Sequence, residues 1–351
     1  MARALALAAL ADGQTSPNPL VGAVVLDAGG GLVGEGFHRR AGAPHAEVVA
    51  LAQAGPRVRG GTLYVSLEPC CHHGRTPPCS ELVVGAGLAR VVVARQDPDP
   101  RVAGAGLAAL AAAGISVSVG LCSGAASALN RPFLHRLATG RALGVLKWAA
   151  SLDGRQATSD GHSQWISGVE ARRWVHSLRA RCDAVVIGGG TLRADDPLLT
   201  SRGQRSPEPL RVVFSRSLAL PAEARLWDQG RAPTLVVHGP APTQRCNAID
   251  DLGVDRLALA EASPRLLAEA LAARGCNRIL WECGPALAAA ALREGCLQTI
   301  EALEAPLLIG GCGAATPLAD FGVRHLDQAL RFAPPRLQRL GPDLRRSVEL
   351  P

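Results

Sequence analysis

The segment between His45 and Cys79 constrains the fold of this chain more than any other part of its sequence. An imidazole at His45 and thiols at Cys70 and Cys79 are side chains that tetrahedral zinc sites use. Because these residues are far apart in the sequence, the chain has to fold so that separate segments end at one point. Three protein ligands leave the fourth tetrahedral position open, which is typical of a catalytic zinc rather than a structural one.

Glu47, two residues after His45, adds an acid–base group to the predicted metal site. Zinc lowers the pKa of a bound water to about 7, and a neighbouring carboxylate can accept and return its proton. An H-x-E sequence with zinc-binding cysteines is typical of hydrolytic deaminases, which exchange a ring amine for oxygen. A structural zinc with Cys71 or a histidine as fourth ligand is the alternative, but such a site does not require Glu47.

The spacing of the two cysteines differs from the usual deaminase pattern. That pattern is P-C-x-x-C, whereas eight residues separate Cys70 from Cys79 here. The difference predicts a subfamily with an enlarged loop. His72 and His73 in this loop are not expected to bind the metal, and together with Arg75 they suit a phosphate-bearing substrate.

Two single residues outside this segment are also informative. Asn18 precedes a proline, and its amide can bind the edge of a pyrimidine, although turn formation alone explains it equally well. Lys147 is the only lysine among 37 basic residues. A site that requires a compact ammonium instead of a planar guanidinium would explain a lysine at this position, and chance is the alternative.

Length and composition limit the classes to which the chain can belong. Its 351 residues are more than a domain with a single hydrophobic core usually contains. Its content of 48% apolar residues is typical of a packed globular protein. It has no apolar run of about 18 residues, so we expect no membrane span. The ten cysteines are scattered along the chain. This pattern is more typical of a protein with free thiols in the reducing cytoplasm than of a protein held together by disulfides. The net charge of +7 comes without a basic block, so we expect no nucleic-acid partner.

Strand and helix patterns alternate along both halves, which predicts two α/β domains, residues 1–142 and 143–351. In the first half we expect strands over 20–26, 31–36, 61–67, 90–94 and 115–119, and helices over 45–54, 79–86 and 106–113. A helix at the N-terminus and a helical connection over 124–142 are also expected. In the second half we expect strands over 145–150, 184–187, 211–214, 234–238, 278–282 and 300–308, and helices over 172–181, 263–274 and 285–294.

Several motifs resemble those of the bifunctional deaminase–reductases of bacterial riboflavin biosynthesis. In the first half they are Asn18-Pro19, Gly34-Glu35-Gly36, His45-Ala46-Glu47, the run from Glu68 to Cys79, and Gln96-Asp97-Pro98. In the second half they are Lys147, the runs 151–155 and 163–167, Thr191, the run 194–197, Leu199-Thr200, Glu282 and Gly284-Pro285. The resemblance covers nearly the whole chain, and the enlarged loop is its most specific part. Cys71 is a departure, since the family usually has serine there.

The resemblance implies a cytidine-deaminase-like, three-layer α/β/α N-terminal domain and a dihydrofolate-reductase-like α/β C-terminal domain. It implies zinc-dependent hydrolytic deamination of 2,5-diamino-6-(5-phosphoribosylamino)pyrimidin-4(3H)-one. NADPH-dependent reduction of 5-amino-6-(5-phosphoribosylamino)uracil to the ribitylamino product would follow, with hydride added at C1′ of the opened sugar. We therefore expect small-molecule substrates, a cytoplasmic location and a homo-oligomer, either a dimer or a tetramer.

The family's pattern also implies roles for individual residues. The metal ligands are His45, Cys70 and Cys79, with Glu47 as the catalytic residue. Residues expected at the substrate are Lys147, Ser163, Arg179, Leu199, Arg202 and Glu282, together with Asn18. Residues expected at NADPH are Ala149, Trp165, Thr191, Asp195, Gly284, Pro285, Ala286, Leu287, Ala288, Ala289 and Ala290. The sequence offers no obvious general acid for the reduction. We therefore expect catalysis of that step to rest on the positioning of the hydride donor next to C1′.

Without the family, the second half gives weaker signals. No G-x-G-x-x-G follows its first strand, so a Rossmann site is not predicted. Gly284-Pro285 predicts either a helix N-terminus that binds pyrophosphate or an ordinary turn. Trp165 can stack on a cofactor or belong to the core, and Arg179 and Arg202 can bind a phosphate or lie at the surface.

The alternative function is a nucleobase or tRNA deaminase with a C-terminal binding domain. Such a protein would require a concentrated basic face and exposed aromatic side chains, whereas aromatic residues make up 3% of this chain. A zinc-stabilised binding module without chemistry is a third alternative, and Glu47 argues against it.

Overall fold

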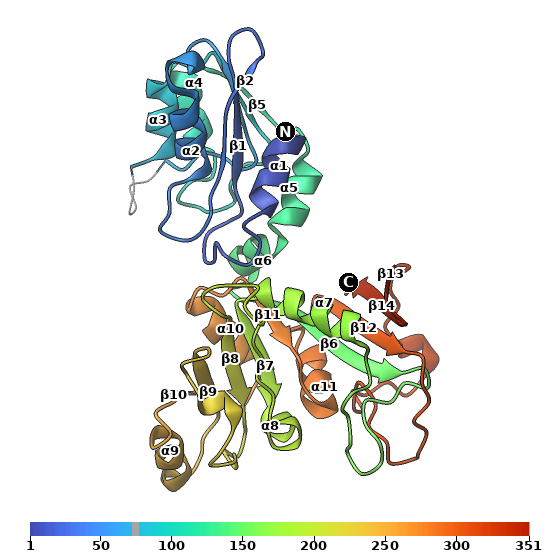
Figure 1. The fold of residues 1–351 in the computed structure, drawn as a ribbon. Coiled ribbons are helices and arrows are strands. Elements are labelled where there is room, and N and C mark those ends of the chain that lie inside the picture. Colours follow the sequence, from blue (N-terminus) through green and yellow to red (C-terminus); the bar gives the residue numbers. More distant parts are fainter. Residues whose placement is uncertain (72–76, 351) are drawn as a thin grey trace. The chain divides into compact units, whose positions relative to one another are not determined.

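A computed structural model describes residues 1–71 and 77–350 of the chain (Figure 1). The chain divides into two compact units, Met1–Thr139 and Gly140–Pro351, and each is described by itself. His72, His73 and Arg75, which we expected to suit a phosphate-bearing substrate, lie outside the described residues. Within the described ranges, no helix combines the length and the apolar character needed to cross a lipid bilayer.

The first unit is built on a five-stranded sheet with the order β2-β1-β3-β4-β5. Its strands are β1 (Gly22–Leu26), β2 (Leu32–Phe37), β3 (Thr62–Val65), β4 (Arg90–Val93) and β5 (Ser116–Val119). β1 runs antiparallel to both of its neighbours, whereas β3, β4 and β5 are parallel to one another. Parallel strands need crossover connections, and α3 (Cys79–Gly85) and α4 (Ala105–Ala112) supply them.

Helices cover both faces of this sheet (Figure 1). α2 (Ala46–Ala54) packs with α3 and α4 on one face, and α1 (Ala2–Ala9) packs near α5 (Ser123–Leu129) on the other. α6 (Arg131–Thr139) ends the unit. Glycines in the strands let α1 and α2 approach the sheet closely. A Cβ at Gly22 would lie 2.0 Å from the Ala4 carbonyl oxygen, and one at Gly34 would lie 2.1 Å from the Ala50 carbonyl oxygen. The unit therefore has three layers, α/β/α.

The second unit contains a nine-stranded sheet with the order β10-β9-β8-β7-β11-β6-β12-β14-β13. Its strands are β6 (Leu143–Ser151), β7 (Ala184–Gly188), β8 (Leu210–Phe214), β9 (Thr234–His238), β10 (Asp255–Ala258), β11 (Arg278–Trp281), β12 (Thr299–Ala305), β13 (Arg336–Leu340) and β14 (Asp343–Glu349). All neighbours are parallel except in the pairs that β14 makes with β12 and β13. Strands such as β7 and β9 are buried along nearly their whole length, as expected for parallel strands covered on both faces.

Helices form a core on each face of this second sheet. The helices are α7 (Val169–Ala180), α8 (Gly189–Asp195), α9 (Thr243–Asp250), α10 (Pro264–Ala273) and α11 (Pro285–Arg293). α10 and α11 contribute Leu267, Leu271 and Ala288 to one core, whereas α7 and α8 contribute Leu178 and Leu192 to the other. Short 3-10 turns occur at Gly55–Val58, Arg225–Trp227 and Leu326–Gln328.

The sequence did not lead us to expect the C-terminal hairpin of β13 and β14. It also did not predict the helices α8 and α9 or the strand β10. β13 is exposed along most of its length and contains arginines, so it lacks the apolar alternation that identifies a strand. Charged residues are common on edge strands because they hinder pairing with other chains. The strand expected over 300–308 ends earlier, at Ala305.

Candidate functional sites

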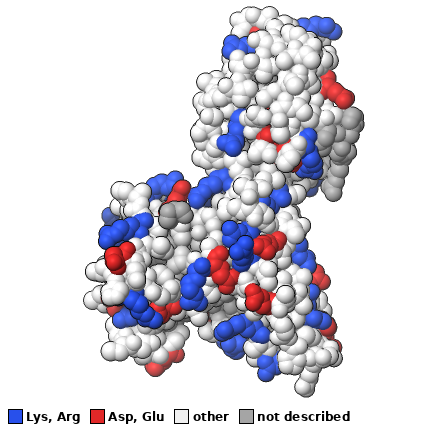
Figure 2. Space-filling model, turned by 180° about the vertical axis from the view of Figure 1, so that it is seen from behind, with Lys and Arg blue, Asp and Glu red and all other residues white. Residues whose placement is uncertain are grey.

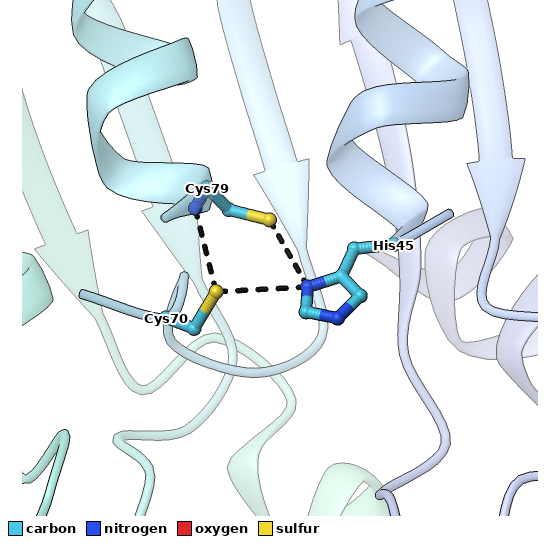
Figure 3. A group of neighbouring side chains, drawn as sticks. All are labelled: His45, Cys70 and Cys79. Carbon is cyan, nitrogen blue, oxygen red and sulfur yellow. Dashed lines mark hydrogen bonds between the residues drawn. The ribbon is translucent and has the colours of Figure 1, made fainter. Parts of the chain in front are cut away.

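His45, Cys70 and Cys79 meet at the ends of three segments of the first unit (Figure 3). His45 has an extended backbone immediately before α2, Cys70 lies in the loop after β3, and Cys79 is the first residue of α3. Their potential ligand atoms all lie within 4.8 Å of one another. Among the described residues, no fourth histidine, cysteine or acidic side chain belongs to the group.

The distances within the group suit a single metal ion. The His45 Nδ1 atom lies 3.2 Å from the Cys79 sulfur and 3.6 Å from the Cys70 sulfur. One nitrogen and two sulfurs around a common point are a donor set that zinc prefers. The residues therefore fit the zinc ion that the sequence predicts, with one position left for a water or a substrate.

The local electrostatics favour thiolate at Cys70. Its pKa is lowered by hydrogen bonding with the Cys79 side chain, and His45 and the Cys79 backbone N–H act in the same direction. The hydrogen bond with Cys70, together with burial, raises the pKa of Cys79. A bound metal would favour thiolate at both positions, because its charge stabilises the deprotonated form.

Glu47 is in the first turn of α2 and is 3% exposed. Burial raises the pKa of its carboxyl to about 7, while the positive charge of His45 acts in the opposite direction. A bound cation would also lower this pKa. A carboxyl with these influences can accept and release a proton near neutral pH, which general acid–base catalysis requires.

Asn18 reaches this centre through a histidine that the sequence analysis missed. The Asn18 amide nitrogen donates to the Nε2 atom of His38 at 3.0 Å. The Nδ1 atom of His38 donates to the Pro44 carbonyl at 3.1 Å, which fixes the tautomer. The His38 and His45 rings meet edge to face, with centroids 5.3 Å apart. The only sequence signal for His38 was its place after the Gly34-Glu35-Gly36 motif.

Glu68 is a second residue that the sequence analysis did not assign to the centre. Its buried carboxylate accepts hydrogen bonds of 3.0–3.2 Å from the backbone N–H groups of Asp97, Gly104, Gly106 and Leu107. Two of these N–H groups belong to the first turn of α4. Glu68 thus ties the chain just before Cys70 to the start of a helix, whose positive end favours an anion.

In the second unit, Lys147, Arg179 and Glu282 form a charged cluster. Lys147 is on β6, Arg179 is near the end of α7, and Glu282 follows β11. Arg179 donates to both carboxylate oxygens of Glu282 at 2.6 and 3.0 Å, and the Lys147 nitrogen lies 3.5 Å from one of them. Burial alone would raise the pKa of Glu282, but the charges of Arg179 and Lys147 outweigh it and lower the pKa to about 2.

The cluster carries more positive than negative charge. Arg202 is exposed on the loop after α8, and its charge, with that of Arg179, helps burial to lower the pKa of His176. Leu199, on the same loop, is 2% exposed and packs in the core, so only its backbone can meet a ligand. Lys147 and Arg179 together leave a net positive charge at Glu282, and Arg179 also contacts the loop that carries Arg202, so this region suits an anionic ligand.

The residues expected at NADPH lie on several elements of the second unit. Ala149 is on β6 and packs beside α7, and Thr191 and Asp195 are on α8. Asp195 accepts a hydrogen bond of 2.9 Å from the hydroxyl of Ser163. Trp165 is 70% exposed, and the Arg172 guanidinium lies 4.8 Å from its ring centroid, so it is not a core residue.

The segment from Gly284 to Ala290 begins α11. Gly284 precedes the helix with an extended backbone, and its position faces Thr191, whose hydroxyl oxygen would lie 3.8 Å from an added Cβ. Ala288 and Ala289 are buried, and the Leu287 side chain faces Gly188, so the N–H groups of the first turn are the parts suited to a ligand. Pro285, Ala286 and Ala290 belong to the same helix.

Basic and acidic side chains are interspersed on the face of the protein that Figure 2 shows. No continuous basic surface is visible among the described residues drawn there. On this face, the distribution lacks the concentrated basic surface that a tRNA-binding protein would require.

Two family models match the chain. The model described as "RibD C-terminal domain" matches residues 142–345. The model described as "Cytidine and deoxycytidylate deaminase zinc-binding region" matches residues 1–95. The chain is 48% identical to the riboflavin biosynthesis protein RibD of Synechocystis sp. over 344 residues, which are 98% of this chain and 93% of the relative. It is 41% identical to RibD of Escherichia coli, with 98% and 96% of the two chains covered.

Solved structures are similar over the whole chain. Acinetobacter baumannii RibD, form 2, has a TM-score of 0.90 at 37% identity, with 100% of this chain and 97% of that chain covered. A Thermotoga maritima protein has a TM-score of 0.88 at 29% identity, with the same coverage. That protein is described as a diaminohydroxyphosphoribosylaminopyrimidine deaminase and 5-amino-6-(5-phosphoribosylamino)uracil reductase. The fold expected for each half is therefore confirmed.

Proposed function

The chain belongs to the RibD family of bifunctional enzymes of riboflavin biosynthesis, and from this premise we propose which residues carry out its two reactions. It is a deaminase and a reductase. We assign the deaminase to residues 1–142 and the reductase to residues 143–351. The substrates are the phosphoribosylaminopyrimidines that the family implies, and a cytoplasmic location and a dimer or tetramer remain predictions.

His45, Cys70 and Cys79 would hold zinc, which would supply a water of lowered pKa for the attack. Glu47 would accept one proton from the attacking water and pass it to the ring nitrogen. It would then accept the remaining hydroxyl proton as the C–O double bond forms and pass it to the amine, which leaves as ammonia. Asn18 binds the pyrimidine edge, and His38 fixes the orientation of its amide through the hydrogen bond of 3.0 Å. The observation that supports this assignment most is the buried Glu47 beside three convergent ligands.

In the second unit, the residues expected at NADPH would hold this cofactor, which would supply hydride for C1′ of the deaminated intermediate. Backbone N–H groups at the start of α11 suit its phosphates, with Thr191, Asp195, Ala149 and Trp165 as further contacts. Lys147, Arg179 and Arg202 bind the anionic substrate, with Ser163 and the backbone of Leu199 nearby. Glu282 holds Lys147 and Arg179 in place, so that hydride donor and acceptor meet in a fixed geometry.

The test is to supply the diamino-pyrimidine phosphate with and without NADPH, and to follow ammonia release and NADPH absorbance. Glu47→Gln is expected to retain zinc and to abolish ammonia release, while reduction of the deaminated intermediate continues. Glu81→Gln is a matched control, because Glu81 is an exposed acid on α3. Full ammonia release by the Glu47 variant would refute its assigned role.

A further inference from the structure

The segment from Leu199 to Gly203 has an unusual backbone. Leu199 has a φ of 54° and Arg202 a φ of 58°, both in the left-handed region that side chains other than glycine seldom adopt. Such conformations cost free energy, so they persist where surrounding contacts determine them. The contacts of this segment therefore show what holds it.

One contact comes from the charged cluster. Arg179, which binds Glu282 with two of its nitrogens, also donates to the Thr200 carbonyl at 3.1 Å. The same guanidinium thus connects the buried carboxylate to the segment. The charge of Arg202 also acts on His176, a residue of α7 that Arg179 influences too. These relations place Arg202 within the electrostatic reach of the cluster.

The other contact comes from Glu208, at the far end of the same loop. Its carboxylate accepts a hydrogen bond of 2.6 Å from the Ser201 backbone N–H and one of 3.0 Å from the Gly203 N–H. These two N–H groups belong to the residues on either side of Arg202. The Ser201 hydroxyl also accepts from the Arg205 N–H at 3.1 Å, which closes the loop.

We propose that Glu208 is a positioning residue for the reductase: it brackets the backbone of Arg202 and so directs the Arg202 guanidinium toward the phosphate of the substrate. This inference rests on the substrate role proposed above for Arg202. Glu208 itself touches only backbone N–H groups in these contacts. A carboxylate that accepts two N–H groups of one turn restricts that turn strongly, because charge-assisted hydrogen bonds are the stronger kind.

The test is the steady-state kinetics of the reductase in the full chain. In Glu208→Gln the amide oxygen can accept, but the amide nitrogen opposes the second N–H group. The KM for the phosphorylated substrate is expected to rise about tenfold, as for the loss of one charged hydrogen bond, with kcat changed less than about twofold. The KM for NADPH and the deaminase activity of the same chain should not change. Glu223→Gln is the matched control, because Glu223 is an exposed acid of the same unit.

A double-mutant cycle with Arg202→Ala separates the possible results. If Glu208 acts through Arg202, Glu208→Gln adds less than about twofold to the KM of the Arg202 variant. The positioning role of Glu208 would be overturned by an unchanged substrate KM in Glu208→Gln. It would also be overturned if kcat, NADPH binding and stability fell as much as substrate binding. Neither result would affect the proposed role of Arg202. An unchanged KM in Arg202→Ala would overturn both this inference and the proposed role of Arg202.

Discussion

The backbone N–H of Cys79 donates a hydrogen bond to the sulfur of Cys70 at 3.3 Å. Cys79 begins α3, so this N–H is one of the helix N-terminal groups that lack a partner within the helix. The contact keeps the two sulfurs together although the enlarged loop separates them in the sequence. Helix geometry at Cys79 thus contributes directly to the arrangement of the metal ligands.

Replacement of Cys70 should remove the metal, whereas replacement of its neighbour should not. Cys71 lies outside the ligand group, and its thiol donates to the Arg101 carbonyl at 3.5 Å. We expect Cys70→Ser to weaken zinc binding by more than the roughly 10–100-fold that loss of an outer partner causes. Cys71→Ser should retain zinc and ammonia release. Measurement of bound zinc after dialysis against a chelator distinguishes the two, and zinc loss from the Cys71 variant would contradict the assignment.

Substitution of Glu68 should weaken the metal centre without touching a ligand. Glu68→Gln can no longer accept all four backbone N–H groups with two oxygens. Leaving buried N–H groups unpaired costs about 1–3 kcal/mol each, so the first unit should unfold at a lower temperature. Zinc affinity should fall as the segment before Cys70 loosens. Calorimetry and chelator competition check both effects, and a result equal to that of Glu81→Gln would refute the prediction.

Acid should destabilise the second unit through Glu282. Its pKa is lowered from 4.5 to about 2 in the folded protein. A lowered folded-state pKa stabilises the fold above the unfolded value of 4.5, and this contribution is lost as pH falls toward 2. Its size is on the order of 3 kcal/mol, from about 1.4 kcal/mol per pKa unit.

Tryptophan fluorescence can follow this effect, because all five tryptophans belong to the second unit. We expect Glu282→Gln to be less stable than the natural chain at neutral pH, since it leaves Arg179 buried without an anion. The difference between the two unfolding free energies should shrink as pH falls below 4.5. A difference that stays constant with pH would show that Glu282 does not titrate as proposed.

The sequence was sufficient for residues whose side-chain type itself suggests a chemistry, such as metal ligands, and was insufficient for residues that act only by accepting backbone N–H groups. The grouping of His45, Cys70 and Cys79 was predictable because strand ends and helix starts carry them. Lys147 was predictable as a candidate site residue because it is the only lysine in the chain. Glu68 and Glu208 were not, because a carboxylate that accepts backbone N–H groups has no sequence pattern of its own. The edge strand β13 was missed because exposed residues on both of its faces hide the alternation.

The close contact between α2 and β2 makes a final prediction about the metal centre. A Cβ at Gly34 would lie 2.1 Å from the Ala50 carbonyl oxygen, so an alanine there must push α2 away from the sheet. Because α2 carries Glu47 and follows His45, Gly34→Ala should lower ammonia release and destabilise the first unit by about 1–3 kcal/mol. Gly85→Ala is the matched control, because an added Cβ there meets nothing within 4 Å, and in a helix it should change stability by less than about 1 kcal/mol. Calorimetry and ammonia release compare the two variants, with reductase activity as the internal reference. Equal behaviour would mean that the helix–sheet contact does not set the position of Glu47.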